Sequence, residues 1–237
     1  EKGSLVGLIG PNGAGKTTVF NLLTGVYTPT SGVIEYQNPK DGSVKNINGL
    51  SPHLISSLGI SRTFQNIRLF KDLTVLDNIR IAIHQNVKYG LFESLFRLPS
   101  YHKEEKEILN ESKKILEIFK LDTKIDELAK NLPYGEQRRL EIARALASNP
   151  SLLLLDEPAA GMNPNETADL TKLIEWIWKE YKLSILLIEH DMSLVMKICE
   201  KIFVLNYGMV IAEGTPKEIK NNKKVIDAYL GGALLDA

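Results

Sequence analysis

Residues 10–18 read Gly10-Pro11-Asn12-Gly13-Ala14-Gly15-Lys16-Thr17-Thr18. A short apolar run precedes them at Val6–Ile9, and an apolar helical pattern follows from Val19. This is the G-x-x-x-x-G-K-[ST] spacing between a strand and a helix, in which backbone N–H groups surround a phosphate. We expect Lys16 to reach the β- and γ-phosphates and the Thr17 hydroxyl to contact Mg²⁺. The alternative, a glycine-rich turn without a ligand, is disfavoured by the fixed spacing, so the sequence predicts a nucleoside triphosphate site.

The composition limits the class of protein. The 237 residues are 43% hydrophobic and 24% charged, which is typical of one globular domain, alone or with an attached subdomain. Lysine plus arginine and aspartate plus glutamate both count 29, so no basic excess points to nucleic acid. The one cysteine, Cys199, favours a reducing, intracellular setting. The apolar runs are shorter than the roughly 18 residues of a membrane span, so work at a membrane would require another chain to cross it.

The order of predicted elements indicates an α/β fold with a mostly parallel sheet, antiparallel edge strands and an inserted helical subdomain. After the first strand, further strands are predicted at 33–36, 44–47, 60–64, 151–155, 184–189, 202–205 and 209–212. Helices are predicted at 51–57, 74–83, 103–119, 136–147 and 165–181, with a terminal helix from 215. The predicted core consists of residues 1–65 and 148–214. A helical subdomain is predicted at 66–147, and a C-terminal helix and tail at 215–237.

An acidic pair follows the most apolar predicted strand. Leu152–Leu155 is the pattern of a strand buried on both faces, and Asp156 and Glu157 come directly after it. Ligands of parallel sheets gather at the carboxyl ends of the strands, so we expect Asp156 to hold Mg²⁺ and Glu157 to orient and deprotonate a water. A helix cap or a solvated turn is the alternative, and the phosphate loop in the same chain argues against it.

A third segment resembles a known family. Residues 132–137 read Leu132-Pro133-Tyr134-Gly135-Glu136-Gln137 before an apolar helix, similar to the signature of the ABC-transporter ATPases. Gln65 resembles the Q-loop, residues 160–163 the D-loop and His190 the switch histidine of that family, in the family's order. The resemblance covers essentially the whole chain and implies a RecA-like P-loop NTPase core that uses ATP and Mg²⁺.

The resemblance also implies roles for individual residues. The catalytic residues would be Glu157, His190, Lys16 and Gln65. The metal would be bound by Thr17, Gln65 and Asp156. The whole loop from Gly10 to Thr18 holds the nucleotide. The signature residues, 132–137, act on the ATP bound by a partner subunit, because the N–H groups at a helix start attract an anion.

Two departures from the family pattern stand out. The family usually has Ser-Gly-Gly where this chain has Pro133-Tyr134-Gly135, so a hydroxyl is missing and Pro133 offers no N–H. The N–H groups from Tyr134 onward remain. The family also has two strands and an adenine-stacking aromatic before the first core strand. Either the sequence is truncated, which we expect, or part of the base pocket is absent, so no residue is assigned to adenine stacking.

Within the family, the sequence is similar to those of the ATPase subunits of branched-chain amino-acid importers. The similar segments are residues 62–70, 73–79, 134–144 and 156–164. The likeness implies a heterodimer with a second ATPase subunit, membrane permeases, an indirect link to a solute-binding protein and a peripheral place on the cytoplasmic face of the membrane. It implies no contact with the amino acid and none with nucleic acid. Alternatives are an amide, urea or lipopolysaccharide system, a soluble ABC ATPase not tied to transport, and a nucleotide-gated scaffold that barely hydrolyses.

Some residues carry weaker hypotheses. A permease-docking groove is expected beside Gln65, formed or bordered by Asn66–Phe70 and by the apolar residues Tyr89, Leu91, Phe92, Leu95 and Phe96. The alternative is that these side chains only pack the helical subdomain. Helical spacing predicts a core face made of Leu170, Leu173, Ile174, Ile177, Trp178 and Tyr181, with Trp176 off that face. Cys199, His53, His84 and His102 show no partner spacing and are assigned neither catalysis nor metal.

Overall fold

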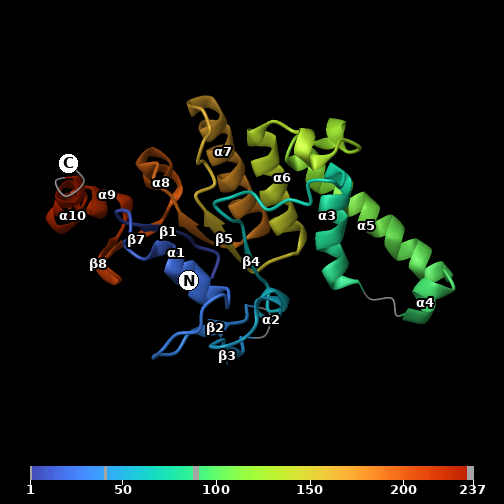
Figure 1. Ribbon diagram of the computed structural model, residues 1–237, viewed down its shortest axis with the longest axis horizontal. Helices are drawn as coiled ribbons and strands as arrows, with labels where there is room; N and C mark the ends of the chain where they lie inside the picture. Colours follow the sequence, from blue (N-terminus) through green and yellow to red (C-terminus); the bar gives the residue numbers. More distant parts are fainter. Residues whose placement is uncertain (1, 40–41, 88–90, 234–237) are drawn as a thin grey trace. The chain divides into compact units, whose positions relative to one another are not determined.

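A computed structural model describes residues 2–39, 42–87 and 91–233, apart from the side chains of residues 86, 91–92 and 230–233 (Figure 1). Its contacts divide the chain into two compact units. The first unit combines Glu1–Gln65 with Ser151–Ala237, and the second is Asn66–Pro150. The last two helices therefore belong to the same unit as the phosphate loop.

The first unit is built on a central sheet. Within the described residues its six strands are ordered β4-β5-β6-β1-β7-β8. They are β1 (Leu5–Ile9), β4 (Ile60–Arg62), β5 (Leu152–Asp156), β6 (Ser184–Ile188), β7 (Lys201–Asn206) and β8 (Met209–Gly214). All neighbours are parallel except β7 and β8, which are antiparallel. The predicted mostly parallel sheet with an antiparallel edge is confirmed.

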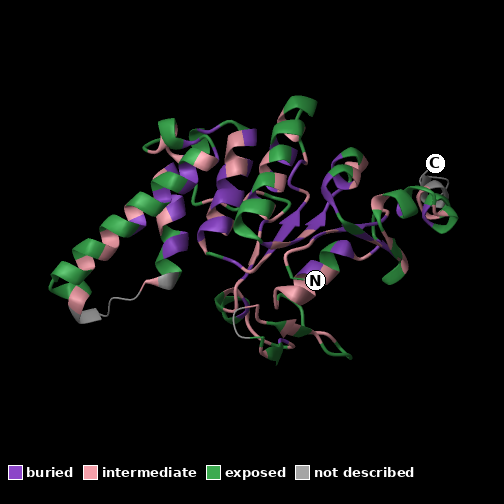
Figure 2. Cartoon of the chain, turned by 180° about the vertical axis from the view of Figure 1, so that it is seen from behind, coloured by how far each residue is buried: buried purple, intermediate pink, exposed green. Residues whose placement is uncertain are grey.

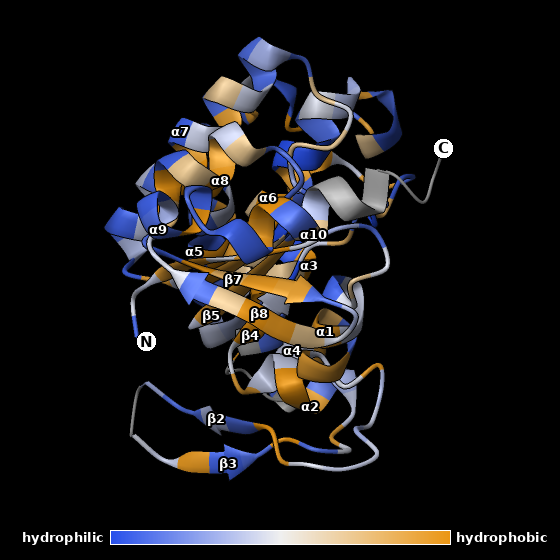
Figure 3. Cartoon of the chain, turned by 90° about the vertical axis from the view of Figure 1, so that its left-hand side faces the viewer, coloured by the Kyte–Doolittle hydropathy of each residue, from blue (hydrophilic) through white to orange (hydrophobic). Residues whose placement is uncertain are grey.

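Helices cover both faces of this sheet. Leu8 of β1 joins a buried cluster with Leu154 and with Phe20 of α1 (Lys16–Leu23). The neighbouring Gly7 faces the other way, because a Cβ built there would lie 3.1 Å from the Cys199 sulfur at the end of α8 (Met192–Ile198). Alternate residues of β1 therefore pack under opposite helices, and the strands form the buried, hydrophobic centre of the unit (Figures 2 and 3).

Helix α7 (Pro164–Tyr181) tests the predicted core face. A capping box between Asn163 and Glu166 starts the helix. Leu170, Ile174 and Ile177 are buried, Leu173 and Trp178 are half-buried, and Trp176 is exposed, as expected. The prediction for Tyr181 is wrong, because this last residue of the helix is 42% exposed. Its ring stands edge-on to Trp176, with centroids 6.2 Å apart, so it packs on the surface instead of in the core.

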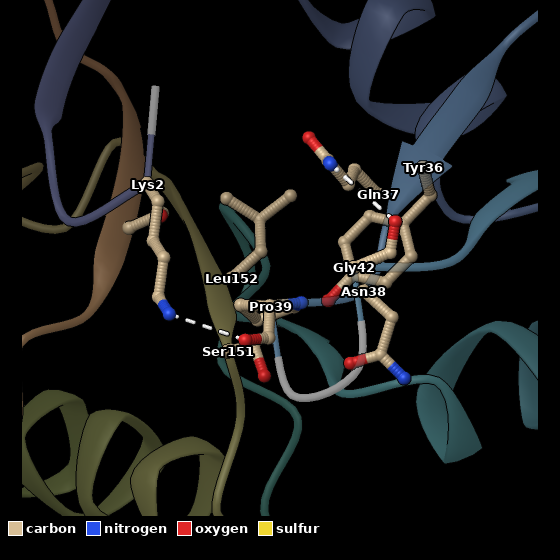
Figure 4. Close-up of a pocket in the computed structure, with 9 residues that line it drawn as sticks. Lys2, Tyr36, Gln37, Asn38, Pro39, Gly42, Ser151 and Leu152 are labelled. Carbon is tan, nitrogen blue, oxygen red and sulfur yellow. Dashed lines mark hydrogen bonds between the residues drawn. The ribbon is translucent and has the colours of Figure 1, made fainter.

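A hairpin and three further helices complete the described part of this unit. Strands β2 (Glu35–Gln37) and β3 (Val44–Asn46) pair antiparallel, as predicted. The chain ends in α9 (Pro216–Lys220) and α10 (Lys223–Ala233), and α2 (Pro52–Ser57) precedes β4. A hollow of about 510 Å³ lies between the hairpin and the first residues of β5 and β6 (Figure 4). There Lys2 donates to the Pro39 carbonyl at 3.1 Å, at the amino ends of the strands and away from their carboxyl ends.

The second unit is helical. It contains α3 (Val75–Ile83), α4 (Leu91–Leu95), α5 (Pro99–Ile118) and α6 (Tyr134–Ala147), with 3₁₀ turns η1 (His84–Asn86), η2 (Asp122–Lys124) and η3 (Ala129–Asn131). The Thr74 side chain caps α3 by accepting from the Asp77 N–H. Helix α5 begins four residues before the predicted start, because a proline is well suited to a first turn. None of the helices that the structure describes is long and apolar enough to cross a bilayer.

Candidate functional site

The loop between β1 and α1 wraps tightly. A Cβ on Gly10 would lie 2.1 Å from the Leu205 carbonyl oxygen, so only glycine fits there. Gly13 has a φ of 76°, a left-handed conformation, with open space around it. The Gly208 N–H donates to the Ala14 carbonyl at 2.9 Å and ties the loop to the β7–β8 turn. Residues 10–15 thus form a fixed cradle at the carboxyl end of β1.

Lys16 lies inside this cradle. It is 6% exposed, and its Nζ donates to the carbonyls of Gly10 and Pro11 at 2.8 and 3.0 Å. Burial lowers the pKa of Lys16 below its usual 10.5, while the nearby carboxylates of Glu157 and Asp156 act in the opposite direction. Helix α1 starts with neither a side-chain cap nor an acidic residue in its first turn. The loop therefore presents a cation and the N–H groups of a helix start to the same space.

The side chains after this lysine are accessible. Thr17 and Thr18 are exposed, as are Asn12 and Gly13 in the loop, whereas Ala14 is buried. Hydroxyl groups at these positions are available to a ligand. Among the loop residues predicted to hold a nucleotide, four are thus exposed around the buried Lys16.

Asp156 ends β5 beside this loop. It is 2% exposed, and its Oδ2 pairs with an Arg62 guanidinium nitrogen at 2.7 Å. Its N–H donates to the Thr63 hydroxyl at 3.2 Å. Since Asp156 is also close enough to raise the pKa of Lys16, the predicted metal-side carboxylate and the predicted phosphate-binding lysine belong to one site.

Glu157 brings two further predicted residues together. Its Oε2 accepts from Gln65 Nε2 at 2.8 Å, and its Oε1 lies 2.7 Å from His190 Nε2. At that distance to a carboxylate, the ring nitrogen is the donor. The Glu157 backbone has a φ of 47°, held by its N–H to the Ile188 carbonyl at 2.9 Å. Gln65, Glu157 and His190 therefore converge, although they lie on three separate loops.

Sequence reasoning missed two buried groups around this site. Glu189, 3% exposed, accepts from the N–H groups of Ala159 at 2.7 Å and of His190 at 2.9 Å. It joins the loop after Glu157 to the loop that carries His190, and burial raises its pKa. Arg62, paired with Asp156, is the second. Neither has a sequence signal, because Arg62 meets Asp156 and Glu189 meets Ala159 only when segments far apart in the sequence come together.

The second unit carries the predicted signature residues at the start of α6. Pro133 precedes the helix, and its carbonyl accepts from the N–H groups of Glu136 and Gln137, both at 3.0 Å. The Gln137 side chain donates back to the Leu132 carbonyl at 2.8 Å, and Glu136 pairs with Lys124 at 2.7 Å. No side chain caps the helix.

The exposure of this helix start is uneven. Pro133 and Tyr134 are exposed, whereas Leu132 and Gly135 are buried. The helix begins at Tyr134, two residues before its predicted start. Pro133 and Tyr134 therefore form the accessible part of the signature.

A buried ion pair supports this helix start from behind. Arg138 and Glu141 are 0% and 1% exposed at their side chains and pair at 2.8 Å. Arg138 also donates to the Tyr134 hydroxyl at 3.1 Å, and Glu141 accepts the Arg68 N–H at 3.0 Å. Tyr134 is thus tied to the interior of its own unit.

The residues of the predicted docking groove are described only in part. Tyr89 and the side chains of Leu91 and Phe92 lie outside the described residues. Leu95 and Phe96 are 72% and 66% exposed, so these two do not serve only to pack the helical unit. Phe70 is 47% exposed, with the Arg144 guanidinium 5.4 Å from its ring centroid.

Comparison with known proteins agrees with this arrangement. A family described as "ABC transporter" matches residues 1–160, and one described as "Branched-chain amino acid ATP-binding cassette transporter" matches residues 209–234. The high-affinity branched-chain amino acid transport ATP-binding protein LivG of Salmonella typhimurium is 48% identical, covering 97% of this chain and 88% of LivG. BraF of Pseudomonas aeruginosa, described in the same words, is 47% identical over 98% of this chain and 89% of its own.

Solved structures give the same result. MJ1267, an ATP-binding cassette of an ABC transporter seen in its ADP conformation, superposes with a TM-score of 0.79. It is 33% identical, and the match covers 97% of this chain and 89% of MJ1267. The chain therefore belongs to the ABC transporter family, in the group of ATP-binding proteins that contains LivG and BraF.

Proposed function

We propose that this chain is the ATP-hydrolysing subunit of an importer for branched-chain amino acids. The observation that carries the proposal is that Gln65 and His190 both contact the Glu157 carboxylate, which lies near the buried lysine of the phosphate loop. The names of LivG and BraF, and the match at residues 209–234, support the substrate class. They favour it over amides, urea or lipopolysaccharide, and over a soluble ABC ATPase.

ATP binds with its phosphates along residues 10–18. The start of α1 attracts the negative charge, and Lys16 exchanges its two carbonyl partners for phosphate oxygens. An ammonium that has lost most of its hydration interacts more strongly with an anion than an exposed one does. Lys16 thus stabilises charge that develops on the β- and γ-phosphates.

The residues around Asp156 fit a magnesium ion. Mg²⁺ prefers oxygen ligands, usually with one or two carboxylates among them, and fills its other positions with phosphates and waters. Asp156 offers a carboxylate, Thr17 a hydroxyl and Gln65 an amide oxygen, and these three would hold the ion. When bound, Mg²⁺ neutralises phosphate charge.

Glu157 is the proton acceptor in hydrolysis. Its carboxylate orients a water and takes the proton as the water attacks the γ-phosphate. His190 and Gln65 hold the two carboxylate oxygens, so they fix the direction in which the group points. His190, 45% exposed at its side chain, also reaches the transferred phosphate.

The signature at 132–137 acts on ATP held by a second ATPase subunit, different from this chain. The exposed Pro133 and Tyr134 meet that nucleotide first, and the N–H groups of the helix start follow. The two ATPase subunits work on the cytoplasmic face of the membrane, bound to permeases. A solute-binding protein delivers the solute to these permeases. Nucleic acid takes no part.

Residues Asn66–Phe70 contact a permease. Arg68 and Phe70 are exposed, and Leu95 and Phe96 add apolar surface in the same unit. Arg68→Glu should lower transport by the assembled complex and leave the ATPase rate of the isolated chain unchanged. Unchanged transport would count against docking here.

The decisive experiment is Glu157→Gln in a complex reconstituted with the permeases. The amide keeps the shape but accepts no proton, so hydrolysis should fall about 100-fold or more and an ATP-bound dimer should accumulate. Size-exclusion chromatography with retained radiolabelled ATP measures both. A nucleotide-gated scaffold would be unaffected by the substitution.

The substrate class is tested separately. Hydrolysis by the wild-type complex is measured with its solute-binding protein and leucine, isoleucine, valine, urea, short-chain amides or lipopolysaccharide. Stimulation by branched-chain amino acids alone supports the proposal. Stimulation by another solute would leave the ATPase assignment intact and overturn the substrate.

A further inference from the structure

One guanidinium group joins the metal-side carboxylate to the phosphate-loop helix. Arg62 of β4 is 6% exposed at its side chain, and its Nη2 donates to Asp156 Oδ2 at 2.7 Å. Its Nη1 donates to the Asn21 side chain at 2.7 Å and to the Thr24 hydroxyl at 3.3 Å, both on α1. A single buried side chain therefore contacts α1 and β5, which carry two of the three predicted metal residues, Thr17 and Asp156.

The surroundings of Arg62 restrict its position. Its guanidinium carbon lies 5.3 Å from the Phe20 ring centroid and 5.0 Å from that of Phe64. Parallel pairing of β4 with β5 sets Arg62 opposite Leu154, two residues before Asp156. Aromatic rings favour a cation over their faces, so the guanidinium is held by rings, by α1 and by the carboxylate together.

The geometry of the pair fixes the orientation of Asp156. Asp156 Oδ2 accepts from Arg62, so Oδ1 is the oxygen that we assign to the metal. A carboxylate that bonds a second partner through one oxygen presents the other in a defined direction, as outer partners of metal ligands do. We propose that Arg62 is a positioning residue that aims Asp156 at the magnesium ion and couples its position to α1. This inference rests on the proposed metal role of Asp156.

An arginine is needed for this task. Its planar fork has two terminal nitrogens, one for Asp156 and one for Asn21, whereas a lysine ammonium is a single point. Loss of the arginine leaves Asp156 with its backbone N–H bond to Thr63 but without its cationic partner. The buried carboxylate then has no fixed direction.

The test measures metal binding without turnover. The full chain is saturated with a fluorescent ADP analogue, and MgCl₂ is titrated while the fluorescence is followed. Arg62→Met should raise the Mg²⁺ concentration for half-saturation about 10- to 100-fold, the range for outer partners of metal ligands. Affinity for the metal-free nucleotide should stay the same. Arg80→Met is the control, because it removes a partly exposed arginine–carboxylate pair, with Glu105 at 2.9 Å, in the other unit. It should change neither value.

A double-mutant cycle separates the inference from the proposed function. If Arg62 acts through Asp156, Arg62→Met should add no further loss of Mg²⁺ affinity in an Asp156→Asn chain. A normal Mg²⁺ titration in Asp156→Asn alone would overturn the metal role of Asp156. A shifted titration in Asp156→Asn with a normal one in Arg62→Met would overturn the inference and leave the metal role standing.

A milder variant guards against a failure to fold. Asn21→Ser removes the α1 partner of Arg62 and leaves the ion pair in place. It should raise the half-saturating Mg²⁺ concentration several-fold, less than Arg62→Met does. If Arg62→Met does not fold, as judged by thermal unfolding, an unshifted titration in Asn21→Ser overturns the inference.

Discussion

Two helix starts in this chain are proposed to bind phosphate, and the side chains around them differ. Helix α1 follows a glycine loop, contains the buried Lys16 and has no side-chain cap. Helix α6 follows Pro133 and is also uncapped, but its lysine neighbour, Lys124, pairs with Glu136. The first start can bind an anion by itself. The second contributes backbone N–H groups and little else, which suits a group that closes a site built elsewhere.

The difference agrees with the separate roles proposed for the two units, nucleotide binding and hydrolysis for the first and subunit association for the second. Around α1, the polar groups converge: Lys16, Asp156 and Glu157 interact electrostatically. In α6, the pair of Arg138 with Glu141 is buried and holds residues of its own unit together. Substitutions at α1 should therefore affect binding and chemistry, whereas those at α6 should affect association of the subunits.

The largest expected effect is the loss of one lysine. Lys16→Met should reduce ATP hydrolysis about 100- to 1,000-fold, the usual loss when one preorganised donor to a transition state is removed. Lys124→Met, beside α6, removes a partly exposed pair and should change the rate less than about twofold. Phosphate release by the complex measures both. Equal losses would contradict the division between the two helix starts.

Next come two glycines of the loop before α1. Gly10→Ala should lower the free energy of unfolding by about 1–3 kcal/mol, because its Cβ would meet the Leu205 carbonyl. Gly13→Ala has open space and only a strained φ, so about 1 kcal/mol is expected. Urea unfolding of both variants measures the difference. If Gly13→Ala proved the more costly, the tight approach at Gly10 would not be what fixes the loop.

A smaller change should strengthen the weaker helix start. Pro133→Ser supplies a hydroxyl and an N–H at the entrance to α6. One added hydrogen bond to the nucleotide should tighten ATP-dependent association with the second ATPase subunit about 2- to 10-fold. Light scattering on the two subunits measures it, with Pro133→Ala as the control that lacks the hydroxyl. An equal gain in both variants would point to the loss of the proline ring.

The smallest effect is a pH dependence of opposite sign at the two lysines. Lys16 has a pKa below 10.5 because of burial, so between the two values the unfolded chain binds more protons. The unfolding free energy should then rise with pH across that window. Lys124 has a pKa raised by its hydrogen bond to Glu136, so its contribution should fall as pH rises above 10.5. Nuclear magnetic resonance titration of the lysine side chains measures both. A Lys16 pKa above 10.5 would contradict its burial.

Sequence patterns predicted most of the fold and the residues that converge on the site. The loop at 10–18 has a spacing that only one structure explains, and the leucine run before Asp156 marks a central strand. Arg62 and Glu189 were missed because their partners are decided by strand register and by loops that meet in space. Tyr181 was misplaced because helical spacing does not show which neighbours the last residue of a helix meets, and this ring packs against the exposed Trp176. These residues depend on tertiary contacts that no local pattern encodes.

The left-handed backbone conformation of Glu157 implies a trade-off between stability and activity. A non-glycine residue in this conformation costs about 1–3 kcal/mol, and glycine or asparagine would adopt it with less strain. A search for thermostable variants that ignores turnover should therefore recover replacements at residue 157 early. Such a search would therefore replace Glu157, the residue on which turnover is proposed to depend.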